Sequence, residues 1–390
     1  MLSDINSSKL PLEGIRVLDF TWILAGPFAT AMMADYGAEV IKLQSHKISS
    51  GTEQNDTYYF ASVNRNKHSI TLDMSRPEAR ELALKLAAKC DVVVQNFTPR
   101  VMENWGLGPE AFKKANPGII TVNLSAMGNS GPWRDFAALA DTIEALSGMV
   151  GGDDPVLTGY PYSDIVSGLF TFNATLAALE GRRHTGRGCN IDISEFEALC
   201  SVLGPSIIAA NIDPVSLDTG ENTGVAGCYK CRGKERWIAV SFDTEEQWQG
   251  LCRAMGSPGW ATESRFSTIS NRKQNRQELD KYIGHWTSGI TVKSALRLLH
   301  SNGVPCSAVN NIHDLAIDPQ LKSRGFFTSY SHSKLGKIVY APPPLKMSVT
   351  TPLLRKPAPL LGEDNGYVFG EILRMDKQKI EDYVEKKIIY

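Results

Sequence analysis

The chain has 390 residues, of which 42% are hydrophobic and 21% charged, so it has the composition of a folded globular protein and the length for two or more domains. A formal charge of −1 gives no electrostatic basis for binding nucleic acid or an anionic membrane surface. We find neither a spanning helix of roughly 20 apolar residues nor the basic and then apolar pattern of a signal peptide, and therefore expect no membrane association.

Strands and helices alternate through the first third of the chain. Strands are predicted at 15–20, 39–43, 68–73, 91–96 and 118–124, and helices at 28–36, 76–89 and 102–115. This alternation is typical of a Rossmann-like, doubly wound parallel sheet, which binds ligands outside the carboxyl ends of its strands. The turn before the first helix lacks the pattern G-x-G-x-x-G, so we expect neither NAD nor FAD to bind there.

One carboxylate, Asp164, stands between a turn rich in proline and tyrosine and an apolar run that ends near Glu180. The side chain of Ser163 or Asp164 could cap a helix that starts here, because a short oxygen-bearing side chain accepts the first free backbone N–H groups. Carboxylates also act as nucleophiles that form covalent acyl or phosphoryl intermediates. The local sequence leaves both roles open for Asp164.

Composition divides the rest of the chain. A short strand at 190–193 and a helix at 195–210 are followed by a polar, turn-rich stretch, and a run of three prolines lies at 342–344. Between these stretches we predict a smaller α+β domain. The predicted segments are the first part of a large domain at 1–212, a linker at 213–224, the small domain at 225–327, a second linker at 328–345 and a C-terminal part at 346–390.

Seven cysteines are spread thinly along the chain. Cys228 and Cys231 have the spacing of half a zinc site, but no second Cys or His pair follows at a matching distance, so we expect no metal. A redox dithiol would need a strand-to-helix context, whereas this pair lies in a predicted strand. We interpret both as ordinary cysteines and expect reduced thiols in a cytoplasmic protein.

Eight short blocks follow one another in a specific order. They are L-E-G-I-R-V-L-D at 12–19, A-G-P-F at 25–28, D-Y-G-A-E-V-I-K at 35–42, N-R-N-K-H-S-I at 64–70, Q-N-F at 95–97, T-G-R-G at 185–188, G-V-P-C at 303–306 and L-L-G-E at 360–363. Any one block is weak, but their order and spacing together resemble the family III CoA-transferases, the enzymes related to formyl-CoA transferase and carnitine CoA-transferase. The resemblance covers nearly the whole chain.

The resemblance implies that Asp164 is the covalent nucleophile. It would attack a donor thioester to give an aspartyl-acyl anhydride, which CoA converts to an aspartyl-CoA thioester before CoA passes to an acceptor acid. CoA thioesters are then substrates, and no permanently bound cofactor is needed, although the site must exclude water. We expect a helix N-terminus beside Asp164 to lower the pKa of its carboxyl group.

The resemblance also implies contacts to CoA. The matching positions are Ile23, Leu24 and Ala25 at the pantetheine and the active site, Leu72, Asn96 and Phe97 around the adenosine, and Arg76 and Arg100 as candidates for the phosphates. The sequence departs from formyl-CoA transferase at Ser45 and Asn104, which replace phosphate-binding arginines, and at Leu24, which replaces a glutamine. That enzyme's glycine-run loop has no counterpart either, so oxalate or formyl specificity is not implied. Succinyl-CoA is the donor that the family suggests.

The family's architecture implies an interlocked dimer of ring-like chains, each with a large domain built from both termini. The partner is either a second copy or a paralogous subunit, and the acceptor acid is left open. One alternative is a non-catalytic, acyl-CoA-binding subunit, against which the G-x-P-x-x-D setting of Asp164 argues. Another is α-methylacyl-CoA racemase, but its histidine is replaced by Ala140, which cannot transfer a proton.

Overall fold

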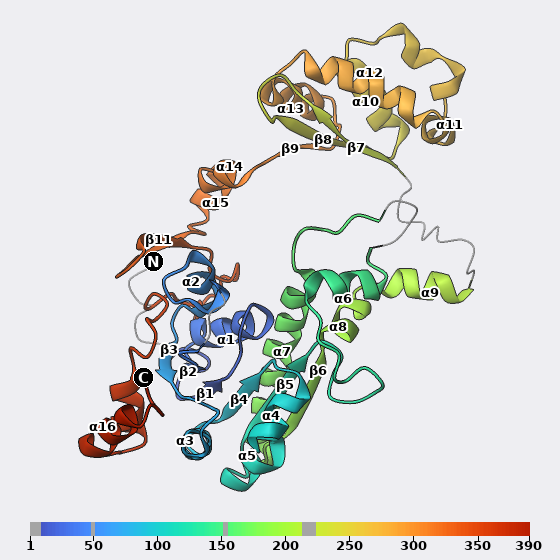
Figure 1. Cartoon of the computed structure of the whole chain (residues 1–390). Coiled ribbons are helices and arrows are strands. Elements are labelled where there is room, and N and C mark those ends of the chain that lie inside the picture. The colour runs from blue at the N-terminus through green and yellow to red at the C-terminus, as the bar shows by residue number, and fades with distance from the viewer. Residues whose placement is uncertain (1–8, 48–50, 151–154, 213–223) are drawn as a thin grey trace. The chain divides into compact units, whose positions relative to one another are not determined.

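The computed structural model describes residues 9–47, 51–150, 155–212 and 224–390 (Figure 1). The chain divides into two compact units. One unit combines Met1–Gly204 with Gly325–Tyr390, and the other comprises Pro205–Arg324. The predicted linker at 213–224 lies outside the described residues except for Gly224.

The larger unit contains a six-stranded parallel sheet with the order β3-β2-β1-β4-β5-β6, which confirms the predicted α/β class. This is the strand order of dinucleotide-binding doubly wound folds. The strands are β1 (Arg16–Asp19), β2 (Glu39–Gln44), β3 (His68–Thr71), β4 (Val92–Gln95), β5 (Ile120–Ser125) and β6 (Asn190–Ser194). The register places Val17 of β1 between Val40 of β2 and Val92 of β4.

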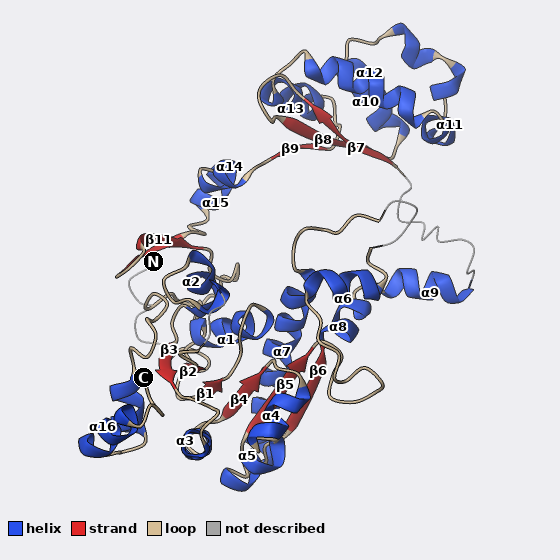
Figure 2. Cartoon of the chain, viewed as in Figure 1, coloured by secondary structure: helices blue, strands red, loops and turns tan. Residues whose placement is uncertain are grey.

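Helices cover both faces of this sheet (Figure 2). Alternate residues of a strand point to opposite faces, so Val17 packs with Met33 and Phe172 of α1 and α7, whereas Leu18 packs with Leu82 and Phe112 of α3 and α5. The helices of this unit are α1 (Ala25–Asp35), α2 (Tyr58–Asn64), α3 (Pro77–Ala87), α4 (Pro99–Trp105), α5 (Pro109–Ala115), α6 (Ala140–Ser147), α7 (Tyr162–Thr185), α8 (Glu195–Ser201) and α16 (Lys377–Glu385), with a 3-10 turn at Gly51–Glu53.

Several predicted elements differ from those observed. The helix expected at 102–115 is two helices, because Gly106 takes φ 68° at the end of α4 and Pro109 starts α5. The expected linker at 328–345 contains the antiparallel hairpin β10 (Thr328–His332) and β11 (Gly336–Tyr340), whose Ile338 and Tyr340 are buried against Phe60. The C-terminal part of the chain contains a π-helix at Gly366–Ile372.

The smaller unit has its own core. An antiparallel sheet with the order β7-β8-β9 packs against helices, and Trp248, Phe266 and Leu299 are fully buried between them. Its elements are α9 (Gly204–Ile212), β7 (Val225–Lys230), β8 (Trp237–Phe242), α10 (Glu245–Ala254), 3-10 turns at Gly259–Thr262 and Ser264–Phe266, α11 (Ile269–Gln274), α12 (Arg276–Ser288), α13 (Val292–Ser301), β9 (Cys306–Val309), α14 (Ile312–Ala316) and α15 (Pro319–Ser323). The single helix expected at 195–210 is thus broken between Ser201 and Gly204.

The cysteines and the helix lengths bear on the expectations about metal and membrane. All seven cysteines are free thiols, and Cys228 is exposed where Cys231 is buried. Among the described residues, no group of three or more His, Cys, Asp or Glu side chains could hold a metal ion. In the same part of the chain no single helix has the length and apolarity of a membrane span, and only the broken pair α8 and α9, counted together, meets both criteria.

Candidate active site

Asp164 lies in the first turn of α7. The helix begins at Tyr162 after Pro161, and the residue before the helix makes no side-chain cap. Of the two roles left open by the sequence, the cap by Ser163 or Asp164 is therefore wrong. Instead, Oδ1 of Asp164 accepts the backbone N–H of Ala25 at 3.2 Å. Ala25 is the first residue of α1, so the carboxyl group faces the loop that joins β1 to α1.

Close packing of α7 on α1 permits this contact. A Cβ atom at position 168 would lie 2.9 Å from the carbonyl oxygen of Ala25 and 2.9 Å from Cδ1 of Phe28. Gly168, one turn after Asp164, therefore lets the two helices approach at their N-terminal ends. The ring of Phe172, a further turn along, stacks on Tyr36 with centroids 5.5 Å apart.

A cavity of about 570 Å³ opens beside Asp164 at the carboxyl ends of four strands. Ile23 follows β1, Asn96 follows β4, Ala126 follows β5 and Glu195 follows β6. Open α/β sheets bind their ligands in such a position. The remaining wall residues are Trp22, Phe97, Thr98, Val101, Ala137, Ala138, Leu139, Ala140 and Thr142.

A second cavity of about 410 Å³ shares Trp22, Phe97 and Val101 with the first. Aromatic rings form much of the common wall, where the centroids of Phe97 and Trp22 lie 5.6 Å apart. Trp105, which lines the second cavity alone, lies at the same distance from Phe97. The apolar part of the lining also includes Phe20, Leu43 and Met74, and the polar part includes Thr21, Ser45, Lys47, Glu53, Asp73 and Ser75. A mostly apolar cavity with a few polar groups is the usual form of a cofactor or small-molecule site.

Lys47 supplies a cation to the second cavity. Its Nζ lies 2.6 Å from Asp73, and half of the lysine side chain is exposed. Although burial opposes it, hydrogen bonds from Lys47 and Ser75 lower the pKa of Asp73 to about 2. Asp73 is therefore ionised at neutral pH and pairs with the ammonium group of Lys47 in the lining of this cavity.

The pKa of Asp164 is raised to about 6, so the expected lowering is wrong. Burial is the main cause, and the negative charges of Glu144 and Asp141 add to it. The N–H of Ala25 opposes the shift but does not outweigh it. At pH 7 the carboxyl group is still mostly ionised, and a carboxylate that is poorly hydrated is available for reaction.

The structure brings together only some of the residues expected to contact CoA. Ile23, Asn96 and Phe97 line the cavity at Asp164, and Phe97 lines both cavities. Leu24 precedes α1, and Ala25 reaches Asp164 through its N–H. Leu72 lies in the buried core of the sheet, whereas Arg76 and Arg100 are on the surface beside Glu78 at 3.9 Å and Asp135 at 3.0 Å.

Sequence reasoning missed Glu195, which shares the cavity with Asp164. Its side chain is only 9% exposed, and burial, with a smaller contribution from the charge of Asp164, raises its pKa to about 8. Glu195 is therefore protonated at neutral pH and adds no second negative charge. The signal that could have found it is its place directly after the carboxyl end of a strand.

The raised pKa of Glu195 predicts a pH-dependent stability. Between about pH 4.5 and pH 8 the folded state binds the proton of Glu195 more tightly than the unfolded state, so this carboxyl group lowers stability as the pH rises through that window. In Glu195→Gln this loss is absent. We expect the variant to gain several degrees in melting temperature over the wild type at pH 9, but not at pH 4. Calorimetry at both pH values checks this, with Glu197→Gln, an exposed residue of α8, as control. A difference in melting temperature between Glu195→Gln and the wild type that is the same at pH 4 and pH 9 would contradict the burial of the Glu195 carboxyl group.

Comparison with known proteins gives a consistent result. A model of a family described as CoA-transferase family III matches residues 12–365. Succinyl-CoA:glutarate CoA-transferase of Mus musculus is 32% identical over 397 residues, covering 97% of this chain and 90% of that protein. The alpha subunit of succinyl-CoA–L-malate CoA-transferase of Chloroflexus aurantiacus is 30% identical, covering 98% and 93%. A crystal structure of a CAIB/BAIF family protein from Brucella suis superposes with a TM-score of 0.84 at 28% identity, covering 94% of this chain and 100% of that one.

Proposed function

The chain belongs to CoA-transferase family III, and from this premise we propose that it moves CoA from an acyl-CoA donor to a free carboxylic acid through covalent intermediates on Asp164. The observation that carries the proposal is a half-buried carboxyl group that faces a cavity at the carboxyl ends of the strands. Succinyl-CoA is the donor that we propose, since the mouse and Chloroflexus relatives are named for it.

The proposed reaction needs only carboxylates and CoA. The carboxylate of Asp164 attacks the thioester carbonyl, CoA leaves as the thiolate, and a mixed anhydride of Asp164 and the acyl group remains. The thiolate then attacks the aspartyl carbonyl, which releases the donor acid and leaves an aspartyl-CoA thioester. The acceptor carboxylate attacks the carbonyl of this thioester, which expels CoA thiolate again and forms an anhydride of the acceptor with Asp164. The returning thiolate attacks the acceptor's carbonyl, which gives the new acyl-CoA and regenerates the carboxylate.

Protonated Glu195 supports this chemistry. An acceptor acid reaches the cavity as an anion, and a second ionised carboxylate beside Asp164 would repel it. Because the pKa of Glu195 is raised to about 8, its carboxyl group is neutral near pH 7 and can donate a hydrogen bond instead. We propose that the acceptor's carboxylate binds in the cavity between these two side chains.

For the CoA moiety we propose the second cavity. Its aromatic wall is shared with the Asp164 cavity through Trp22 and Phe97, so a long substrate can extend from one into the other. Lys47 lines this cavity, and we propose that it binds a CoA phosphate in place of the arginines replaced by Ser45 and Asn104. Arg76 and Arg100 remain candidates for the remaining phosphates.

We also propose a dimer of interlocked chains, formed with a second copy or a paralogous subunit. Helix α7 exposes Tyr162, Leu169 and Phe170, each more than 40% accessible. No residue of α9 is buried, and its apolar residues Ile208 and Ile212 are exposed. Apolar helix surfaces of this kind are typical of regions that a partner chain covers. The Chloroflexus relative is named as an alpha subunit.

The covalent intermediate provides the test. The protein is incubated with succinyl-CoA and other acyl-CoAs, treated with hydroxylamine or borohydride, and digested for mass spectrometry. We expect a hydroxamate or a reduced side chain at Asp164 that appears only when a donor is present. No label with any donor would favour the alternative of a non-catalytic, acyl-CoA-binding subunit, and this chain alone would then fail to exchange labelled CoA into an acyl-CoA.

The pKa of Asp164 predicts the acid limb of the pH–rate profile. The nucleophile must be ionised, so kcat/KM for the acyl-CoA is expected to fall tenfold per pH unit below about pH 6. An unperturbed aspartate would place this limb near its ordinary pKa of 3.8. Initial rates between pH 4.5 and pH 8, in buffers of constant ionic strength, measure it. A rate that stays constant down to pH 4.5 would contradict the burial of the reacting carboxylate.

A further inference from the structure

Side chains from four different parts of the chain hold the loop between β1 and α1. Its backbone N–H groups are accepted as follows: Thr21 by Asp19 at 2.8 Å, Trp22 by Asn96 at 2.8 Å, Ile23 by Glu53 at 2.9 Å and Ala25 by Asp164 at 3.2 Å. Asn96 also donates to the carbonyl oxygen of Trp22 at 2.9 Å. Three of these four acceptors are distant in sequence, so long-range contacts hold most of the loop.

Ile23 adopts an unfavourable backbone conformation at the centre of the loop. Its φ is 64°, in the left-handed region that a β-branched residue rarely enters. Such a conformation is strained and persists only where the surroundings enforce it. Because Ile23 lines the cavity of Asp164 and lies two residues before Ala25, relaxation of Ile23 would also move the N–H that Asp164 accepts.

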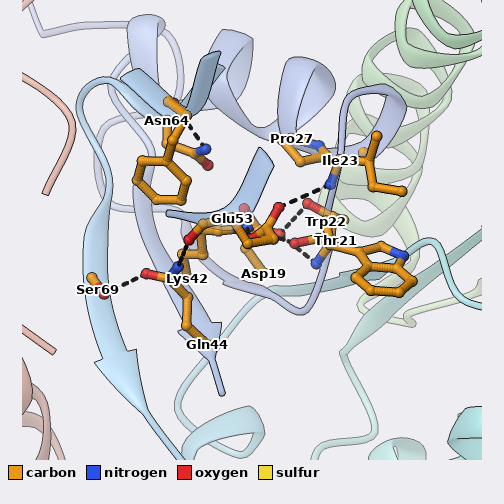
Figure 3. A network of polar contacts seen from close by, with 12 residues as sticks. Asp19, Thr21, Trp22, Ile23, Pro27, Lys42, Gln44, Glu53, Asn64 and Ser69 are labelled. Carbon is orange, nitrogen blue, oxygen red and sulfur yellow. Dashed lines mark hydrogen bonds and ion pairs between the residues drawn. The ribbon is translucent and has the colours of Figure 1, made fainter. Parts of the chain in front are cut away.

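A buried ion pair contacts the backbone at and before this position (Figure 3). Glu53 lies 3.2 Å from Lys42, and their side chains are 2% and 0% exposed. Lys42 donates to the carbonyl oxygen of Thr21 at 2.6 Å, while Glu53 accepts the N–H of Ile23. The pair thus holds the loop on both sides of Trp22, from β2 and from the turn at Gly51–Glu53.

We infer that Glu53, fixed by Lys42, is a positioning residue that holds Ile23 in its left-handed conformation and so keeps the N–H of Ala25 directed at Asp164. The inference rests on the proposed role of Asp164 but adds a residue that does not touch the reacting atoms. Without the acceptor at Glu53, Ile23 is free to relax. Asp164 then loses the hydrogen bond from Ala25 that favours its ionised form.

The test compares the wild type with Glu53→Ala and with the same variant carrying Ile23→Gly. For Glu53→Ala we expect kcat to fall about 10- to 100-fold and the acid limb to move to higher pH. Glycine adopts positive φ without steric cost, so Ile23→Gly in this background should recover a substantial part of both losses. Asp56→Ala, an exposed carboxylate three residues later, is the matched control and should leave both quantities unchanged.

A second variant guards against a simple folding defect. Replacing both members of a buried ion pair by apolar residues is often neutral for stability, so Lys42→Met/Glu53→Leu removes the acceptor while leaving no unpaired buried charge. It should show the same loss of kcat and the same shift of the limb, with faster amide hydrogen exchange at residues 21–25. An unchanged kcat and limb in a folded variant, or the absence of any recovery with Ile23→Gly, would overturn the inference.

Labelling of Asp164 separates this inference from the proposed function. If succinyl-CoA and the other donors leave no adduct on the wild type, the proposed role of Asp164 fails whatever the Glu53 variants do. If the wild type is labelled and the Glu53 variants are labelled at the same rate, only the positioning role fails. A labelling rate that falls with kcat in Glu53→Ala and recovers with Ile23→Gly supports both.

Discussion

Asp164→Asn is expected to lower the rate of CoA transfer by about 10³-fold or more, because loss of a covalent nucleophile removes the step on which the others depend. The amide is nearly isosteric, and its oxygen can still accept the N–H of Ala25, so the loss would reflect chemistry rather than packing. Steady-state transfer from succinyl-CoA to a panel of carboxylic acids measures the effect, and hydroxylamine trapping should find no adduct at this position.

Glu180→Gln is the matched control for this experiment. It makes the same carboxyl-to-amide change on the same helix, α7, but at its exposed end. Transfer by Glu180→Gln should equal that of the wild type. Undiminished transfer by Asp164→Asn would refute the covalent role. A wild-type chain that is inactive alone but active with a paralogue would instead identify the accessory subunit of a two-chain enzyme.

Asp19→Asn is expected to lower the free energy of unfolding of the larger unit by about 3–5 kcal/mol, because it leaves the buried Lys67 without its carboxylate. Asp19 lies 3.0 Å from Nζ of Lys67, and both side chains are 0% exposed. Burial lowers the pKa of Lys67 to about 8 against the opposing charge of Asp19, and Lys67 and Lys42 lower the pKa of Asp19 although its burial opposes this. Each charge therefore depends on the other.

A double-mutant cycle in urea denaturation measures this dependence. Lys67→Met should cost a similar free energy, and the double variant Asp19→Asn/Lys67→Met should lose clearly less than the sum of the two single losses. The control is Lys377→Met. The Lys377 side chain is 91% accessible and its Nζ lies 3.6 Å from Glu381, so its loss should change the free energy of unfolding by less than about 1 kcal/mol. Additive losses for the buried pair would contradict the coupling.

The same buried network connects stability to the site. Asp19 accepts the N–H of Thr21, and Lys42 binds both the carbonyl oxygen of Thr21 and the carboxylate of Glu53. These charged groups contact the loop that carries Ile23 and Ala25. Burying them costs desolvation free energy, and we propose that they are retained because they hold the backbone of this loop at the proposed reaction centre.

Strand positions were predictable because buried strands of a parallel sheet are short apolar runs between turn residues. All six strands of the large sheet match predicted segments to within a few residues. The ends of helices were less predictable. Gly106 and Pro109 divide one expected helix, and the proline-rich stretch near 342 concealed a hairpin whose Ile338 and Tyr340 bury alternate side chains.

The order of motifs along the chain sufficed to indicate the family and to single out Asp164, since both depend on residue identity and spacing alone. Only the tertiary structure decided the direction of its pKa shift, because burial is a property of what surrounds a carboxyl group and here outweighs the helix N-terminus. The same holds for Glu195 and Glu53, which lie 31 and 111 residues from Asp164 along the chain and reach its neighbourhood only through the crossover order of the sheet and the β1–α1 loop. Glu53 has no local signal, and the place of Glu195 directly after a strand does not reveal its neighbour, because the contacts that make both residues significant join segments that are distant in sequence.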